Sequence, residues 1–295
     1  MKLQGLAKEV VKQRWGYYFI LPSFVLYAIF FLFPVLWSMV LSFLDYGWWG
    51  TTFVGLDNYR SVFSDRIFWI GLRNTVYYTL GVVPLWLAKA VIIAALIFPF
   101  RKGIQTFFKA AFYLPHVTSS VIISMIWLWI YNPPFGLLNY LMKAMGFEPV
   151  TWLGNTSTAM PAMIFMTVVM GGGSSIVLIS AAMNGIPSYL YEAAEIDGAS
   201  SMRLFWKITL PLLRPTLLYL TVMGTINSFQ VFTNIYLMTQ GGPQFATTTI
   251  VYQIYELAFS RFQFGRASAM AMVLFAITFA FALIQFKWLG HEVEY

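Results

Sequence analysis

YYFILPSFVLYAIFFLFPVLWSMVLSF, residues 17–43, is an apolar stretch without a single charged side chain. It lies in a run of 30 uncharged residues between Arg14 and Asp45. A helix that crosses the hydrocarbon of a bilayer needs about 20 apolar residues. The apolar core of a secretory signal peptide is shorter, about 7–15 residues. We therefore expect residues 17–43 to form an uncleaved membrane-spanning helix.

Five further stretches of the chain are long and apolar enough to cross a membrane. The six predicted spans lie near 17–43, 74–98, 111–131, 160–183, 216–238 and 267–289. These stretches lack the strict alternation of a β-barrel, and backbone groups in lipid must bond within their own segment, so helices are expected. The sequence predicts an all-α, polytopic integral membrane protein with about six transmembrane helices, folded as one domain over 1–295.

The composition supports the same class. Of 295 residues, 59% are hydrophobic and only 10% are charged, with a mean hydropathy of +0.71. Soluble domains carry roughly a quarter charged residues. A soluble enzyme and a disordered chain are thereby excluded, and the absence of cysteine excludes a disulfide-stapled secreted module.

The basic residues indicate which side each loop faces. Of the 18 lysines and arginines, eleven fall in the N-terminal tail, in the loop between spans two and three, in the loop between spans four and five, and at the C-terminal end. Six fall in the other loops. The positive-inside rule therefore places both termini, including an N-terminal tail over 1–16, in the cytoplasm. The net charge of +7 is mainly a topology signal.

Reactive groups are scarce. The chain has two histidines, no cysteine and no glycine-rich P-loop for ATP phosphates. We predict no catalytic, cofactor-binding or metal-binding residues, and hence no enzyme. Gly171, Gly172 and Gly173 are interpreted as small residues that allow close helix contact.

The loop over 187–215 holds the most informative pattern. Pro187 and Ser188 suit a helix start, and Gly198 suits a helix end in the left-handed conformation. Ser200 or Ser201 can cap a second short helix, which we expect Pro211 to stop. An apolar stripe on this second helix can anchor it to the membrane domain; its members are Leu204, Phe205, Ile208 and Leu212. From the residues alone, a docking helix pair and a merely interfacial amphipathic helix remain open.

The same loop resembles the EAA loop of permease subunits in type I, binding-protein-dependent ABC importers. The pattern is carried by Glu192-Ala193-Ala194, Ile196-Asp197-Gly198-Ala199, Phe205, Ile208 and Leu210-Pro211. The resemblance extends over nearly the whole chain and is greatest to the sugar-importer branch, specifically to the maltose-permease-F-like or glycerol-phosphate-permease-A-like member of its heterodimeric pair. It implies a MetI-like permease fold in the inner membrane of a prokaryote. Lys89, inside the second span, departs from the family pattern.

The resemblance also implies partners. These are a second permease forming a heterodimer, two ABC ATPase subunits that bind ATP and Mg, and an extracytoplasmic sugar-binding protein that delivers a carbohydrate, with an oligosaccharide expected. Glu192 would face a basic or polar group on the ATPase, Ala193 and Ala194 would sit in its groove, and Gly198 would set the angle between the two helices. Asp197 and Ala199 complete this ATPase-coupling set.

Three carboxamides in the fifth span are candidates for the substrate path. Asn227, Gln230 and Asn234 are spaced by three and four, which would put them on one helical face. Carboxamides offer donors and acceptors to sugar hydroxyls. Hydrogen bonding between helices explains such residues equally well.

Lys89 admits several roles. It could snorkel toward the interface, bond to carbonyls at the subunit interface or attract an anionic solute. An ion- or proton-coupled carrier for a polar solute is the alternative function, although such carriers usually need more ionisable groups inside the spans. An intramembrane enzyme would need clustered His, Asp or Glu side chains at membrane depth, and the sequence of the spans does not offer such a cluster.

Overall fold

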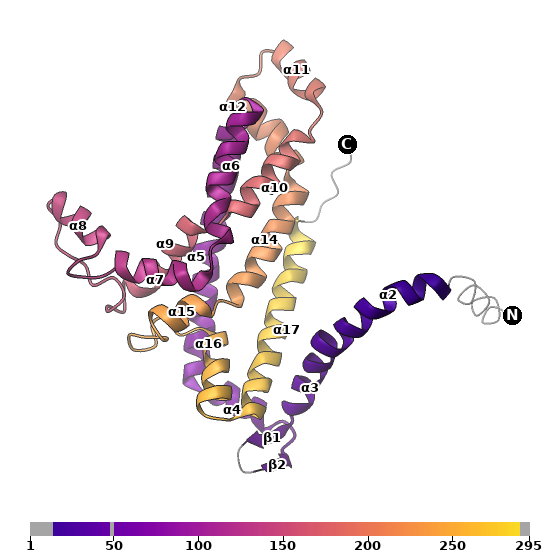
Figure 1. The fold of residues 1–295 in the computed structure, drawn as a ribbon, viewed down its shortest axis with the longest axis vertical. Helices are drawn as coiled ribbons and strands as arrows, with labels where there is room; N and C mark the ends of the chain where they lie inside the picture. Colours follow the sequence, from indigo (N-terminus) through magenta and orange to yellow (C-terminus); the bar gives the residue numbers. More distant parts are fainter. Residues whose placement is uncertain (1–13, 48–49, 290–295) are drawn as a thin grey trace. The chain divides into compact units, whose positions relative to one another are not determined.

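The computed structural model describes residues 14–47 and 50–289 (Figure 1). The described chain divides into two compact units. The first holds the residues up to Ser64 together with Leu257–Met272, and the second holds Asp65–Glu256 and the residues from Val273 on. Most of the predicted N-terminal tail, and with it Lys2, Lys8 and Lys12, lies outside the described residues.

The first unit begins with the predicted first span. It consists of α2 (Arg14–Tyr27), a π-helical segment η1 (Ala28–Leu32) and α3 (Phe33–Leu41). A short antiparallel hairpin follows, β1 (Leu44–Gly47) with β2 (Gly50–Phe53), in which Leu44 pairs with Phe53. The remaining elements are α4 (Asp57–Ser64), all but the first residue of η3 (Glu256–Ser260) and the start of α17 (Phe264–Leu289).

A side-chain amide fixes the hairpin to the helices of this unit. The Asn58 amide donates to the carbonyl oxygens of Ser42 and Leu44 at 3.0 and 2.8 Å. A Cβ atom at Gly265 would lie 1.9 Å from the Leu44 oxygen, so only glycine allows α17 to start so close to the hairpin.

The second unit is a bundle around the long helix α5 (Arg66–Ile97). Asp65 caps this helix by accepting from the Ile67 N–H at 2.8 Å. The other helices are α6 (Lys102–Val117), α7 (Ser120–Ile130), α8 (Leu137–Ala144), α9 (Ala159–Met170), α10 (Gly173–Asn184), α11 (Ser188–Ile196), α12 (Ser201–Leu204), η2 (Phe205–Thr209), α13 (Leu210–Leu212), α14 (Arg214–Phe229), α15 (Thr233–Met238), α16 (Ile250–Tyr255) and the rest of α17. In Figure 1, α11 lies at the end of this unit opposite α16.

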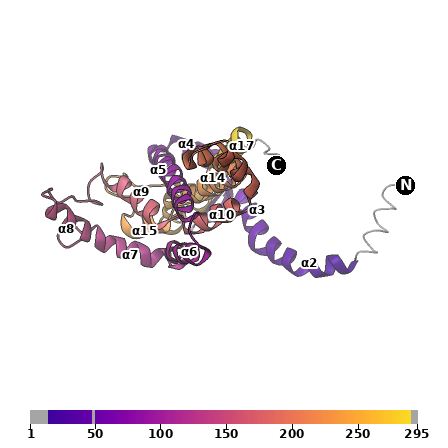
Figure 2. The ribbon, with the colours of Figure 1, turned by 90° about the horizontal axis from the view of Figure 1, so that it is seen from above.

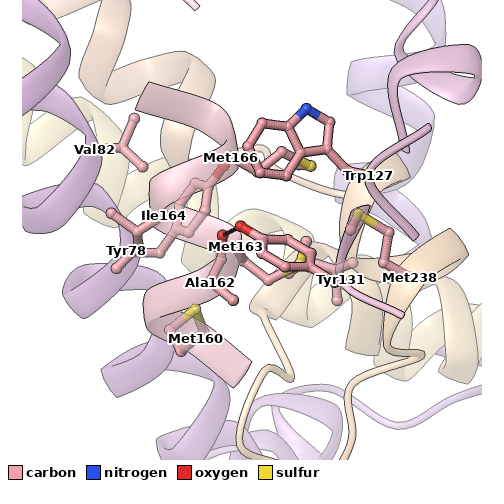
Figure 3. Packing of buried hydrophobic residues seen from close by; sticks show 11 residues of the cluster. Tyr78, Val82, Trp127, Tyr131, Met160, Ala162, Met163, Ile164, Met166 and Met238 are labelled. Carbon is pink, nitrogen blue, oxygen red and sulfur yellow. Dashed lines mark hydrogen bonds between the residues drawn. The ribbon is translucent and has the colours of Figure 1, made fainter. Parts of the chain in front are cut away.

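The core of this unit gathers where α5, α7, α9 and α15 meet (Figure 3). Tyr131 is 2% exposed and its hydroxyl donates to the Ala162 carbonyl at 2.6 Å. Tyr78 is equally buried and its hydroxyl bonds the Thr167 hydroxyl at 2.8 Å. Buried methionines fill the space between these rings, which suits their flexible side chains. Each buried phenol oxygen thus has a partner, as burial requires.

Three predicted spans are confirmed as long apolar helices, over Tyr18–Leu41, Arg66–Ile97 and Phe264–Trp288. Two others are broken. The pair α6 and α7 bends by 93°, so that α7 leads sideways from the end of α6 (Figure 2), and the pair α9 and α10 bends by 47°. The described helices thus give three spans, or five if each bent pair counts as one.

The remaining prediction, a continuous fifth span over 216–238, is wrong in detail. The helix α14 ends at Phe229, and α15 starts only at Thr233. The Thr249 hydroxyl donates to the Val231 carbonyl at 3.2 Å, so a side chain far along the sequence satisfies a backbone group that the break leaves free.

Candidate functional site: the helix pair over 187–215 and the broken spans

The helix α11 begins and ends where the sequence predicts. Pro187 stands at its N-cap, and the chain leaves it through Gly198 at φ +77°. Two backbone bonds close this end: Gly198 N–H donates to Glu195 O at 3.0 Å, and Ala199 N–H donates to Ala194 O at 2.9 Å. This pair of bonds is the Schellman motif, whose left-handed position favours glycine because a Cβ there is strained. The predicted left-handed Gly198 is confirmed.

The coupling residues predicted on this loop lie mostly at the surface. Glu192, Ala193, Asp197 and Gly198 are exposed, whereas Ala194 and Ala199 are half-buried. The adjacent Ile196 is 87% exposed. An almost fully exposed isoleucine beside acidic side chains and a small alanine ridge is a surface suited to contact with another protein.

Sequence reasoning missed what holds this helix in place. The Tyr191 hydroxyl bonds the hydroxyl of Thr209 at 3.0 Å, and Thr209 is 3% exposed. The Tyr191 ring also lies against Phe98, with 6.5 Å between ring centroids. Tyr191, the fourth residue of α11, carried no signal of this role, because both of its partners lie outside the helix, 18 positions later and more than 90 positions earlier in the sequence.

The second helix of the pair differs from the prediction. It does not stop at Pro211: α12, η2 and α13 run without interruption from Ser201 to Leu212. Proline lacks an N–H and clashes with the carbonyl four residues before it. For Pro211 that carbonyl belongs to Lys207, within the wider π-helical turn of η2, which accommodates the proline. Leu204 is buried as the predicted stripe requires, and Leu213 is buried more deeply, at 1% exposure.

The glycines between α9 and α10 serve both as a break and as a contact. Gly172 has φ +97°, which interrupts the helix. A Cβ atom at Gly173 would lie 2.4 Å from the Phe112 carbonyl oxygen and 2.8 Å from the Tyr113 Cα, so α6 and α10 touch here backbone to backbone. The close contact expected of these glycines is confirmed, and the break is an addition to it.

Lys89 fills this break. Its ammonium donates to the carbonyl oxygens of Val168, Val169 and Gly171, the latter two at 3.0 and 2.6 Å. The last carbonyls of a helix have no partner within the helix and carry the negative end of its dipole. Lys89 thus bonds to carbonyls, but not at the predicted subunit interface: they belong to the end of α9 and to Gly171 of this chain.

The three carboxamides do not share one helical face. Asn227 lies on α14, Gln230 at the break and Asn234 on α15. Asn234 is half-buried and its side-chain oxygen accepts from the Ser124 hydroxyl on α7 at 3.1 Å, a bond between helices. Asn227 and Gln230 are exposed. The prediction of a single row was wrong because it assumed an unbroken fifth span.

Comparison with known proteins adds the family. Residues 90–289 match the family model of the binding-protein-dependent transport system inner membrane component. The chain is 35% identical to the probable ABC transporter permease protein YurN of Bacillus subtilis, over 92% of this chain and 94% of that protein. It is 32% identical to the multiple sugar-binding transport system permease protein MsmF of Streptococcus mutans, over 95% and 97%.

Solved structures show the same fold. A chain of a bacterial ABC transporter that imports the acidic polysaccharide alginate superposes with a TM-score of 0.87 at 22% identity, covering 98% of this chain and 99% of that one. A chain from the bacterial alginate ABC transporter in complex with a periplasmic protein bound to alginate pentasaccharide superposes with a TM-score of 0.84, covering 94% of each. The family match, the close relatives and the membrane-spanning helices agree, and the chain therefore belongs to the family of binding-protein-dependent ABC transporter permeases, the inner membrane components of these systems.

Proposed function

We propose that this chain is one of two permease subunits of an ATP-driven importer that moves a carbohydrate, such as an oligosaccharide, into a prokaryotic cell. The observation that carries this is the exposed surface of α11, ended by the Schellman motif at Gly198. MsmF of Streptococcus mutans and the diacetylchitobiose permease NgcF of Streptomyces coelicolor, at 32% and 35% identity, support a sugar as cargo.

The helix pair over 187–215 is the joint with an ABC ATPase. Glu192 faces a basic or polar group there, Ala193 and Ala194 fit its groove, and Gly198 fixes the angle at which α11 is presented. Two ATPase subunits bind ATP and Mg, and this chain transmits their closure to the bundle. Both termini lie in the cytoplasm, as the distribution of basic residues predicts.

The remaining partners are a second permease and an extracytoplasmic binding protein that delivers the sugar. Asn227 and Gln230 are exposed on this subunit, and amides exposed at membrane depth need partners, so we place them toward the second permease and the cargo. Uptake of several sugars by Asn227→Ala and Gln230→Ala tests that placement. An unchanged rate and an unchanged sugar preference in both variants would remove it.

The carrier alternative finds little support in the second unit. Lys89 is the candidate relay there, and its ammonium already bonds three carbonyl oxygens. A proton relay needs ionisable groups that exchange partners.

Reconstitution tests the proposed function. Proteoliposomes with this chain, its companion permease, the ATPases and the binding protein are expected to accumulate sugar only with ATP and the binding protein together. Vesicles containing this chain alone are the control. Accumulation in those vesicles under an ion gradient would refute an ATP-driven importer in favour of a carrier.

A further inference from the structure

A cavity of about 590 Å³ lies in the second unit, away from the helix pair. Its walls come from three segments: the first turns of α5, the chain just before and at the start of α9, and the loop over 241–249. The side chains that matter are Arg66, Arg73 and Tyr77 on α5, Ser157 before α9 and Gln244 on the loop. By the charge distribution of the sequence, all three segments face outside the cell.

The two arginines give this cavity its chemistry. They are seven residues apart on α5, two turns and about 10 Å along the helix, and so they share a face. Both are exposed, and neither makes an ion pair or hydrogen bond with any residue that the structure describes. No carboxylate is among the described residues that line the cavity. Arginine presents a planar fork of donors that fits a carboxylate.

The rim of the cavity is held rigidly. The buried Asn74 amide donates to the carbonyl oxygens of Phe245 and Thr248 at 2.8 and 3.0 Å, which fixes the loop to α5. Gln244 and Phe245, at the rim, have φ of +47° and +63°. Two successive non-glycine residues in the left-handed region are strained, and such strain concentrates at binding sites.

The floor of the cavity is closed. Asn74 and Met160 are 5% and 3% exposed; the first is engaged with the loop and the second belongs to the core cluster. A sugar that entered here could continue toward the cytoplasm only by unpacking that core. A rigid, basic, closed pocket suits a side chain that inserts from outside, not a solute in transit.

We propose that this cavity is a docking pocket for the extracytoplasmic binding protein and takes one or two of its surface carboxylates against Arg66 and Arg73. The inference rests on the proposed function, because that function supplies the partner and the side of the membrane. Charge pairs at the rim of an interface act mainly on association and its salt dependence.

The test compares Arg66→Gln, Arg73→Gln and the double variant in the complete importer, reconstituted in nanodiscs. The readout is ATPase activity as a function of binding-protein concentration. We expect the double variant to need about 2- to 30-fold more binding protein for half-saturation, because exposed ion pairs contribute about 0.2–1 kcal/mol each. In the double variant, the binding-protein concentration at half-saturation should also depend much less on salt. Its ATPase activity without binding protein should be unchanged. Arg261→Gln, an exposed arginine outside the cavity, is the matched control and should change half-saturation less than about 2-fold.

The results of these measurements distinguish the binding protein from a lipid headgroup or the solute as the occupant of the cavity. Unchanged half-saturation at low salt in the double variant overturns the proposal. An effect seen only in nanodiscs with anionic lipid points to a lipid headgroup and overturns it too, as does a lower maximal rate at unchanged half-saturation, which points to the solute. A wild-type complex that does not respond to binding protein would instead refute the proposed function.

A second measurement does not depend on the arginine variants folding. The chain contains no cysteine, so Gln244→Cys introduces one thiol at the rim. A thiol-to-carboxylate cross-linker should join it to the binding protein, and high salt should suppress the product. Failure to cross-link under conditions in which ATPase stimulation is normal would contradict the docking pocket.

Discussion

Substituting Gly198 by valine tests the proposed contact between α11 of this chain and the ATPase. At φ +77°, an added Cβ would meet no described atom within 4 Å, so the substitution introduces backbone strain without a clash. Left-handed backbone costs an ordinary residue about 1–2 kcal/mol, and β-branched residues tolerate it least. If that strain is relieved by leaving the left-handed well, the conformation that presents α11 becomes about 5- to 30-fold less populated. We expect ATP-driven transport to fall by a comparable factor.

A second glycine provides a closely matched control. Gly146, after α8, has φ +82° and likewise no described atom within 4 Å of an added Cβ. It closes its helix with the same two bonds, from Gly146 N–H to Lys143 O and from Phe147 N–H to Met142 O. Gly146→Val therefore introduces the same strain in a loop expected outside the cell. It should leave ATP-driven transport near the wild-type rate.

The assay is sugar uptake into proteoliposomes, with the amount of inserted protein measured in parallel. Gly198→Asn should transport better than Gly198→Val, because asparagine enters the left-handed region more easily. Normal uptake by Gly198→Val would refute the reasoning. Equal losses in the two valine variants would show that strain itself, not the position of α11, is responsible.

Three further substitutions test the packing of the second unit. Lys89→Met leaves three carbonyls unbonded, at about 2 kcal/mol each, and removes a charge that itself costs about 3 kcal/mol in a membrane. We therefore expect a net loss of about 3 kcal/mol and a lower unfolding temperature. An unchanged unfolding midpoint would contradict the capping role of Lys89. Gly173→Ala forces α10 away from α6 and should destabilise the folded protein by about 1–3 kcal/mol, measured by the same thermal unfolding. Gly103→Ala is the control, because an added Cβ there meets open space and should not lower the unfolding temperature. Asn139→Ala removes four hydrogen bonds, to Pro133, Val150 and Trp152. The loop between α8 and α9 should then be cut faster by protease added outside the cell. A cleavage rate equal to that of the wild type would contradict the role of Asn139 in holding this loop.

The sequence predicts the spans well but not their breaks. Runs without charge mark where the chain enters a bilayer, because the transfer cost of charged groups is large. The break at Gly172 depends on φ +97° and on the Lys89 ammonium, whose sequence position is some 80 residues earlier. The break after Phe229 depends on Thr249. Local periodicity carries no information about such distant partners, so 216–238 reads as one helix.

The candidate sites divide in the same way. Gly198 could be predicted because a Schellman motif is local, with its bonds closing within six residues. The cavity could not, since Asn74 reaches Phe245 across 171 positions and the two arginines are brought to the loop only by that packing. Asn227, Gln230 and Asn234 show the reverse error, in which a local spacing suggested a surface that the folded chain does not form.

The helix α5 joins these two regions of the molecule. It runs unbroken for 32 residues, about 48 Å at 1.5 Å per residue, with Arg66 and Arg73 near its start and Phe98, which touches Tyr191, directly after its end. Under the proposed function, the binding protein acts near the start of α5 and the ATPase near its end. A tilt of this one helix would then displace both surfaces together.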